Sequence, residues 1–128
     1  MSEKNKAIIE KINAAFAENN YEGFLDFCAD DAQWTIVGDR SVKGKDAIRQ
    51  WMKSMAEENS EPPKFTVNNV FAEGDLVAAY GDMTMKEKDG KTGQYSYCDI
   101  YRFRDDKIIE LNSFVVKTQP KAEATPGA

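Results

Sequence analysis

The period of the apolar residues changes along this chain, and that change constrains its fold more than any other feature. Early segments carry apolar side chains every three or four positions, as on one face of an amphipathic helix, whereas later segments alternate as strands do. We expect helices over residues 3–18, 21–27 and 46–57, and strands over 33–37, 65–71, 76–86, 94–104 and 108–117. This order predicts an α+β domain in which three N-terminal helices pack on a curved antiparallel sheet.

A length of 128 residues suits one hydrophobic core, and we assign a single domain to residues 1–118. Residues 119–128 are small, polar and proline-containing, so we predict a disordered C-terminal tail. No apolar run approaches the roughly 18 residues that cross a membrane, and the first residues lack the apolar core of a signal peptide. We therefore expect a cytoplasmic protein without a membrane partner.

Composition narrows the chemistry that the chain can perform. The formal net charge of −5 disfavours nucleic acid as a partner, because phosphates are bound by clustered Lys and Arg. The sequence has no histidine, which removes the commonest general base and the commonest metal ligand. Cys28 and Cys98 are far apart and show no metal or redox spacing. We expect no metal and no organic cofactor, so any catalysis has to use carboxylates, tyrosines, lysines or water.

Three segments carry a resemblance to a known family: NNYEGFLDFCADDAQW, VKGKDAIRQWM and YCDIYRFRDDKIIEL. Together they resemble the SnoaL-like polyketide cyclases and the ketosteroid isomerases of the nuclear transport factor 2-like superfamily. The resemblance covers roughly residues 6–117 and implies a cone-shaped fold with a pocket between helices and sheet. It implies no particular activity, because this superfold hosts isomerases, cyclases, dehydratases, hydrolases and non-catalytic binders.

The resemblance implies a catalytic role for only some of the matching positions. The isomerases use a helix tyrosine, an aspartate base on the first strand and a protonated aspartate on the long strand. These positions fall on Ile12, on Ile36 (or Thr35), and on Asp99, so only the last carboxyl is retained. The related epoxide hydrolases need an Asp-Arg-Asp set, and the sequence offers no arginine for it at a position expected to face the pocket.

Asp99 is also the oddest residue of its own strand. Because strand side chains alternate between faces, Tyr95, Tyr97, Asp99, Tyr101 and Phe103 share one face. A carboxyl within an aromatic row loses hydration, so its pKa should rise unless hydrogen-bond donors stabilise the charge. Asp99 is therefore a candidate catalytic residue with Tyr97 and Tyr101 as ligand contacts, although a purely structural hydrogen bond would explain the same pattern.

The partner of Asp99 across the hairpin depends on the turn. A loop around residues 89–92 sets Asp82 opposite Asp99, which would let two carboxyls share a proton, and a tighter turn sets Tyr80 there. We therefore take Asp82 as a second catalytic candidate and Tyr80 as a ligand contact. The alternative is that Asp82 faces solvent.

Trp34 and Met52 complete the candidate ligand contacts, although both residue types are more often simply core. On the other side of the late strands we place Cys98 and Ile100, with Met83 and Met85 beside them. Apolar residues on both faces of a sheet imply that both are covered. We expect a homodimer through the outer sheet face, as is common in the family that the chain resembles.

Two functions remain in competition at this point. The first is a cofactor-independent isomerase, cyclase or dehydratase that acts on an apolar oxygenated small molecule through Asp99. The second is a non-catalytic ligand-binding or dimeric interaction module on the same fold. An aspartate in an aromatic row favours the first, and the missing base and the absence of histidine favour the second.

Overall fold

The computed structural model describes residues 2–18, 20–58, 64–87 and 89–118, so the predicted tail at 119–128 lies outside the described residues. The helices are α1 (Ser2–Ala17), α2 (Tyr21–Leu25) and α3 (Lys45–Glu58). The strands are β1 (Cys28–Ile36), β2 (Arg40–Lys43), β3 (Lys64–Glu73), β4 (Leu76–Lys86), β5 (Thr92–Arg104) and β6 (Lys107–Thr118). The predicted α+β fold class is confirmed.

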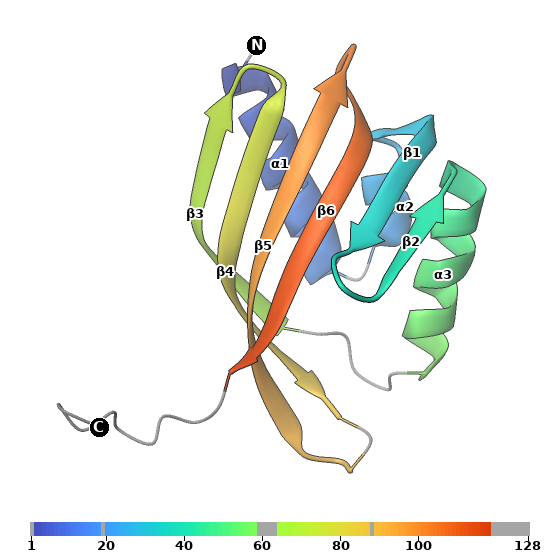
Figure 1. Ribbon diagram of the computed structural model, residues 1–128, viewed down its shortest axis with the longest axis vertical. Coiled ribbons are helices and arrows are strands. Elements are labelled where there is room, and N and C mark those ends of the chain that lie inside the picture. The colour runs from blue at the N-terminus through green and yellow to red at the C-terminus, as the bar shows by residue number, and fades with distance from the viewer. Residues whose placement is uncertain (1, 19, 59–63, 88, 119–128) are drawn as a thin grey trace, which may run out of the picture.

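One curved sheet of six strands carries the fold, in the order β2-β1-β6-β5-β4-β3 (Figure 1). Neighbouring strands are antiparallel except β1 and β6, which are parallel because the chain passes through β2, α3 and three further strands between them. We expected an antiparallel sheet, and the observed sheet is mixed because β1 and β6 are parallel. The short edge strand β2 was not predicted.

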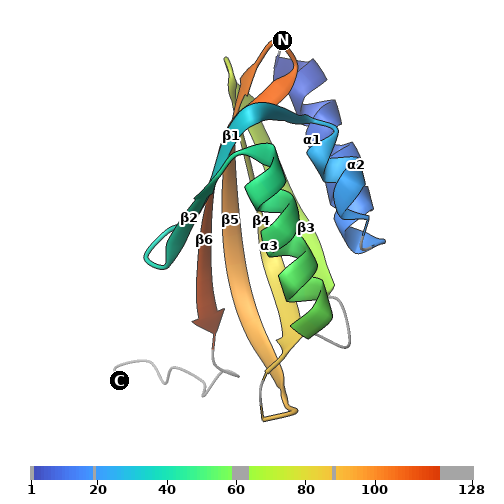
Figure 2. The ribbon, with the colours of Figure 1, turned by 90° about the vertical axis from the view of Figure 1, so that its right-hand side faces the viewer.

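All three helices lie on the same side of the sheet, as Figure 2 shows. We call that side of the sheet the inner face and the opposite side the outer face. Helix α1 packs against β3 and β4, and α3 packs against β1 and β2. The two longer helices thus lie over opposite parts of the sheet, with the central strands β5 and β6 between them.

The core fills the space between the helices and the inner face. Its fully buried side chains come from every layer, which buries the apolar stripe of each helix against the strands. They include Ile9 and Ile12 of α1, Leu25 of α2, Ile48 of α3 and Leu111 of β6. Met52 is buried in this core, with 8% of its surface exposed.

A bulge in β3 brings backbone close to β4. The register between these strands shifts between Val67 and Asn69, and a Cβ atom on Gly81 of β4 would collide with the carbonyl oxygen of Thr66. That carbonyl accepts a hydrogen bond from the Tyr97 hydroxyl at 2.9 Å. Glycine at position 81 thus permits the approach that holds the ring of Tyr97 at this end of the sheet.

Candidate functional site

The register of the strands decides which side chains meet on the inner face. Asp99 on β5 pairs with Ala79 on β4 and with Ser113 on β6. Ser113 pairs in turn with Ile36 on β1, and Ile36 pairs with Arg40 on β2. Paired residues share a face, so these side chains form one row across the inner face, which we call the Asp99 row.

The prediction that Asp82 or Tyr80 lies opposite Asp99 is wrong. Asp82 pairs with Ser96 and Tyr80 pairs with Cys98, so both point to the outer face. The reason is the turn, which is centred on Asp89 and in which the Glu87 N–H donates to the Lys91 carbonyl, so that the register differs from the two expected ones by three residues and by one. A shift by an odd number of residues exchanges the two faces of a strand.

Asp82 and Tyr80 have hydrogen-bond partners on the outer face. Asp82 accepts hydrogen bonds from Ser96 at 3.1 Å and from Asn68 at 3.3 Å. The Tyr80 hydroxyl accepts one from Asn69 at 2.7 Å, and its ring stacks on that of Phe71. The structure therefore provides no pair of facing carboxyls at Asp99.

A short line of hydrogen bonds runs to Asp99 along the inner face. The indole Nε1 of Trp34 donates to the Ser113 hydroxyl oxygen at 2.9 Å, and the Ser113 side chain hydrogen-bonds Asp99. Trp34 thus shares a face with Asp99, as predicted, but its N–H is taken by Ser113. Ser113 was missed, because a serine within a strand carries no signal that separates it from a surface residue.

Desolvation dominates the electrostatics of this carboxyl. Burial raises the pKa of Asp99 from 3.8 to about 6, and the Ser113 hydrogen bond opposes that rise without cancelling it. Part of the residue nevertheless remains accessible. Asp99 is therefore a carboxyl that titrates close to neutral pH.

Two tyrosines flank Asp99 along β5. Burial first, and then the negative charge of Asp99, raise the pKa of Tyr97 to about 12. The same two causes raise the pKa of Tyr101 well above its ordinary value. Tyr101 is completely buried, and its hydroxyl has no hydrogen-bond partner among the described residues. Both phenols therefore stay protonated at neutral pH.

Six aromatic rings from helices and strands form a chain of contacts around the Asp99 row, which we call the aromatic belt. Successive ring centroids lie 4.8, 5.5, 5.0, 6.4 and 6.3 Å apart. All of these rings except Phe24 belong to partly exposed residues. The belt consists of Trp51, Trp34, Phe24, Phe16, Phe65 and Tyr97.

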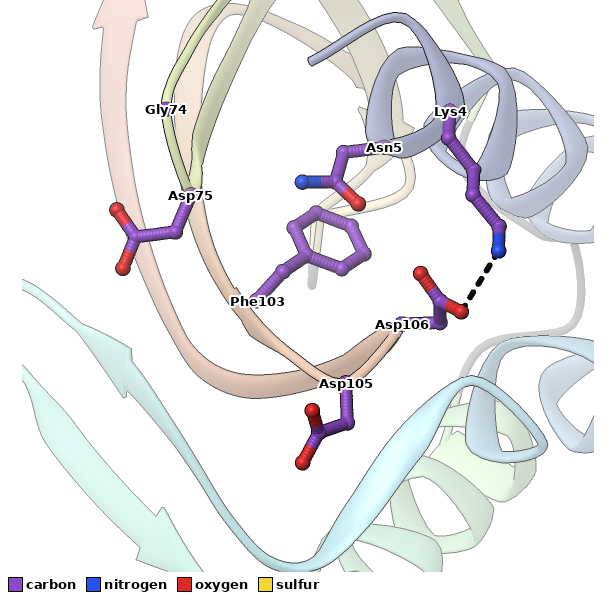
Figure 3. A pocket seen from close by; sticks show the side chains of 7 residues that line it. All are labelled: Lys4, Asn5, Gly74, Asp75, Phe103, Asp105 and Asp106. Atoms are coloured by element: carbon purple, nitrogen blue, oxygen red, sulfur yellow. Dashed lines mark hydrogen bonds and ion pairs between the residues drawn. The ribbon is translucent and has the colours of Figure 1, made fainter. Parts of the chain in front are cut away.

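A cleft of about 450 Å³ lies at a different place, between the start of α1 and the turns that follow β3 and β5 (Figure 3). Phe103 and Asn5 contribute to its lining, and Asp99 does not. Two ion pairs lie at this cleft, Lys4 with Asp106 at 2.8 Å and Asp75 with Arg102 at 3.1 Å. This cleft was not predicted and is not the expected pocket.

The described part of the chain contains neither a metal site nor a membrane-spanning helix. None of its groups of Cys, Asp and Glu side chains is arranged to hold a metal ion. None of its helices is both long and apolar enough to cross a membrane.

The residues predicted for the outer face are corrected in part. Cys98 and Ile100 do lie there, whereas Met83 and Met85 pair with Tyr95 and Gly93 and face the helices. The outer face instead presents Phe71, Tyr80, Phe114 and Val116, which are 40–62% exposed. Cys98 joins Tyr80 to Phe114 across three neighbouring strands, so these apolar side chains are contiguous.

Fold and site together define an α+β protein of cone type whose inner face holds the desolvated carboxyl of Asp99. The model of the SnoaL-like domain family matches residues 9–111, and the chain belongs to that family. No curated protein matches it.

Solved structures agree with this assignment. An NTF2-like protein of unknown function from Cytophaga hutchinsonii is 26% identical, with a TM-score of 0.74 over 87% of this chain and 98% of that one. An LEH-like epoxide hydrolase of M. tuberculosis is 13% identical, with a TM-score of 0.77 over 90% and 84%. TerC, co-crystallised with polyporic acid, is 17% identical, with a TM-score of 0.75 over 86% and 89%. The last two show the fold alone.

Proposed function

We propose that the protein binds a small apolar, oxygenated molecule against the inner face of its sheet and acts on it by acid–base chemistry at Asp99. The reaction class is a cofactor-independent isomerisation, cyclisation or dehydration. One observation carries the proposal: Asp99 is desolvated on the inner face, where its carboxyl is hydrogen-bonded by Ser113, the residue to which the belt residue Trp34 donates. The belt supplies apolar contact area, and Asp99 supplies the polar group that orients the ligand.

A carboxyl with a pKa of about 6 suits this chemistry. Near neutral pH such a group is mostly ionised and can accept a proton, yet its conjugate acid is weak enough to be formed and to return the proton. An ordinary aspartate, with a pKa near 3.9, is a far weaker base.

The chain has to perform the proton transfer with one carboxyl rather than two. Ile12 is fully buried in the core, and Ile36 lies beside Ser113 in the Asp99 row, at the two positions where the isomerases carry a tyrosine and a base. Asp99 would therefore take and return the same proton, since Asp82 lies on the outer face.

The proposal is tested by binding of flat oxygenated probes, with 1-tetralone as the ketone and 2-naphthol as the phenol. A probe at a hundred times its Kd adds about 2.7 kcal/mol to stability, which a thermal-shift assay resolves easily. We expect Asp99→Asn to weaken binding of 2-naphthol by roughly tenfold at neutral pH, because the naphthol hydroxyl donates to the ionised carboxyl, in the range of a hydrogen bond to a charged group. Asp82→Asn is the matched control on the neighbouring strand and should leave binding unchanged. Equal effects of the two substitutions would contradict the proposal.

A second candidate function is a non-catalytic dimeric module, favoured by the exposed apolar side chains of the outer face. Phe114 and Val116 are 42% and 62% exposed, and contiguous apolar patches of this kind mark interaction surfaces. We propose a homodimer through this face. Sedimentation should show a dimer at tens of micromolar that Phe114→Lys dissociates. Val67→Lys, at a residue of similar exposure on the inner face, should leave it intact. A monomeric wild-type chain would contradict the dimer.

A further inference from the structure

Arg40 occupies the end of the Asp99 row. It opens β2 and pairs with Ile36, which pairs with Ser113, which pairs with Asp99. Three strand spacings of about 4.8 Å therefore separate the backbones of Arg40 and Asp99. Arg40 could not be singled out from its own segment, because it follows a Gly-Asp turn and lies in a strand too short to predict.

The Arg40 guanidinium lies at the tryptophan end of the aromatic belt. Its Cζ atom is 5.9 Å from the ring centroid of Trp51, whose ring packs edge-on against Trp34 at 4.8 Å. Trp34 in turn donates its indole N–H to Ser113, the neighbour of Asp99. A cation, two apolar rings and a titratable carboxyl thus follow one another along one side of the sheet.

The charge of Arg40 is weakly matched within the protein. Its ion pair with Asp39 joins Nε to Oδ1 at 3.9 Å, between side chains that are 57% and 64% exposed, and such pairs contribute little. By contrast, Arg49 is held by Glu22 and Asp46 at 2.8 Å each, and Lys117 is held by Glu87 at 2.7 Å. Within the described residues, the terminal amino groups of Arg40 have no hydrogen-bond partner.

We propose that the ligand of this protein is an apolar cyclic carboxylate whose acid group is bound by Arg40. This inference rests on the proposed function. It adds the chemical class of the ligand and the orientation in which the ligand binds. The carboxylate accepts the paired N–H groups of the guanidinium, the rings lie against Trp34 and Trp51, and an oxygen at the far end meets Asp99. A local cation is needed because the net charge of −5 repels anions at longer range.

The test compares two probes with one skeleton, 4′-hydroxybiphenyl-4-carboxylate and its methyl ester, by isothermal titration calorimetry at pH 7 and low salt. We expect the wild-type chain to bind the acid roughly tenfold more tightly than the ester, as a charge-assisted pair predicts. Arg40→Gln should remove that preference and leave the affinity for the ester within about twofold. Arg40→Lys should retain part of it, because charge remains without the paired geometry.

Arg104→Gln is the matched control. Arg104 is also 57% exposed, but it pairs with Asp31 at 3.3 Å, away from the belt, so both affinities should stay unchanged. Equal binding of acid and ester by the wild-type chain would overturn the inference, as would an equal loss for both probes in Arg40→Gln. If the carboxylate inference fails in this way, but the ester still binds and Asp99→Asn weakens ester binding, the proposed function survives. If neither probe binds, both proposals are contradicted.

Discussion

The inner and outer faces of the sheet are built from alternate residues of the same strands, yet they differ in chemistry. Along β5, Tyr97, Asp99 and Tyr101 point toward the helices, whereas Cys98 and Ile100 point away from them. The inner side chains lie in a desolvated, aromatic environment. The outer apolar side chains are largely exposed in the single chain. Position relative to the helices, and not residue type, separates a candidate site from a candidate interface.

Two aspartates on neighbouring strands show the same contrast. Asp99, on the inner face, is hydrogen-bonded by Ser113, and its pKa is raised to about 6 by burial. Asp82, on the outer face, is exposed and accepts hydrogen bonds from Ser96 and Asn68. Register alone sets this difference between the two carboxyls.

The largest expected effect is the loss of an inner aromatic ring. Phe24 is 1% exposed and contacts both Phe16 and Trp34, so Phe24→Ala should destabilise the chain by about 3–5 kcal/mol. Phe114→Ala on the outer face, where the ring is 42% exposed, should cost about 1 kcal/mol or less in the monomer. Urea unfolding at low protein concentration measures both, and similar losses would erase the distinction between the faces.

The parts of the fold that could be predicted from the sequence are those set by local patterns. Helices α1 and α3 and strands β3 to β6 were predicted because their periods are local properties of the chain. Strand β2 was missed because its four residues include one apolar side chain, Val42. The parallel pairing of β1 with β6 joins distant segments, which no local pattern encodes.

The candidate site was predictable only where one residue was unusual in itself. Asp99 stood out as a carboxyl in an aromatic row, and the structure places it as that alternation requires. Its neighbours depended on register, which a five-residue connection between β4 and β5 shifted by an odd number of positions. Ser113 and Arg40 reach the site only through pairing across strands, so neither could be found from its own segment.

The next largest effect concerns the cost of holding the Asp99 charge. A pKa raised from 3.8 to about 6 means that the native state binds this proton more tightly than the unfolded chain does. The resulting stabilisation is complete below pH 3.8 and is lost as pH rises through 6. Asp99→Asn should therefore stabilise the chain at pH 7 by up to about 3 kcal/mol, and by nothing near pH 3.

Thermal and urea unfolding across that pH range check this prediction. Asp82→Asn, on the outer face, serves as the control and should show no comparable gain at pH 7. If Asp99→Asn unfolds the protein, or destabilises it at pH 7, the carboxylate has a structural role that outweighs its desolvation.

A smaller effect separates the two tyrosines beside Asp99. The Tyr101 hydroxyl is buried without a partner among the described residues, so Tyr101→Phe should raise stability by about 1–2 kcal/mol. The Tyr97 hydroxyl donates to the Thr66 carbonyl at 2.9 Å, so Tyr97→Phe should lower stability by about 1 kcal/mol. Differential scanning calorimetry resolves the two signs. A loss in Tyr101→Phe would mean that its hydroxyl is satisfied in solution.

The proton affinity of Asp99 decides whether the inner face holds a desolvated acid–base group. Carboxyl ¹³C NMR of aspartate-labelled protein, with the Asp99 signal assigned through Asp99→Asn, gives its titration midpoint in the folded chain. We expect a midpoint near pH 6, which should move when 2-naphthol is added, because the ligand contacts one protonation state better than the other. A midpoint near 3.8 that no probe moves would contradict the claim that the inner face holds a desolvated acid–base group.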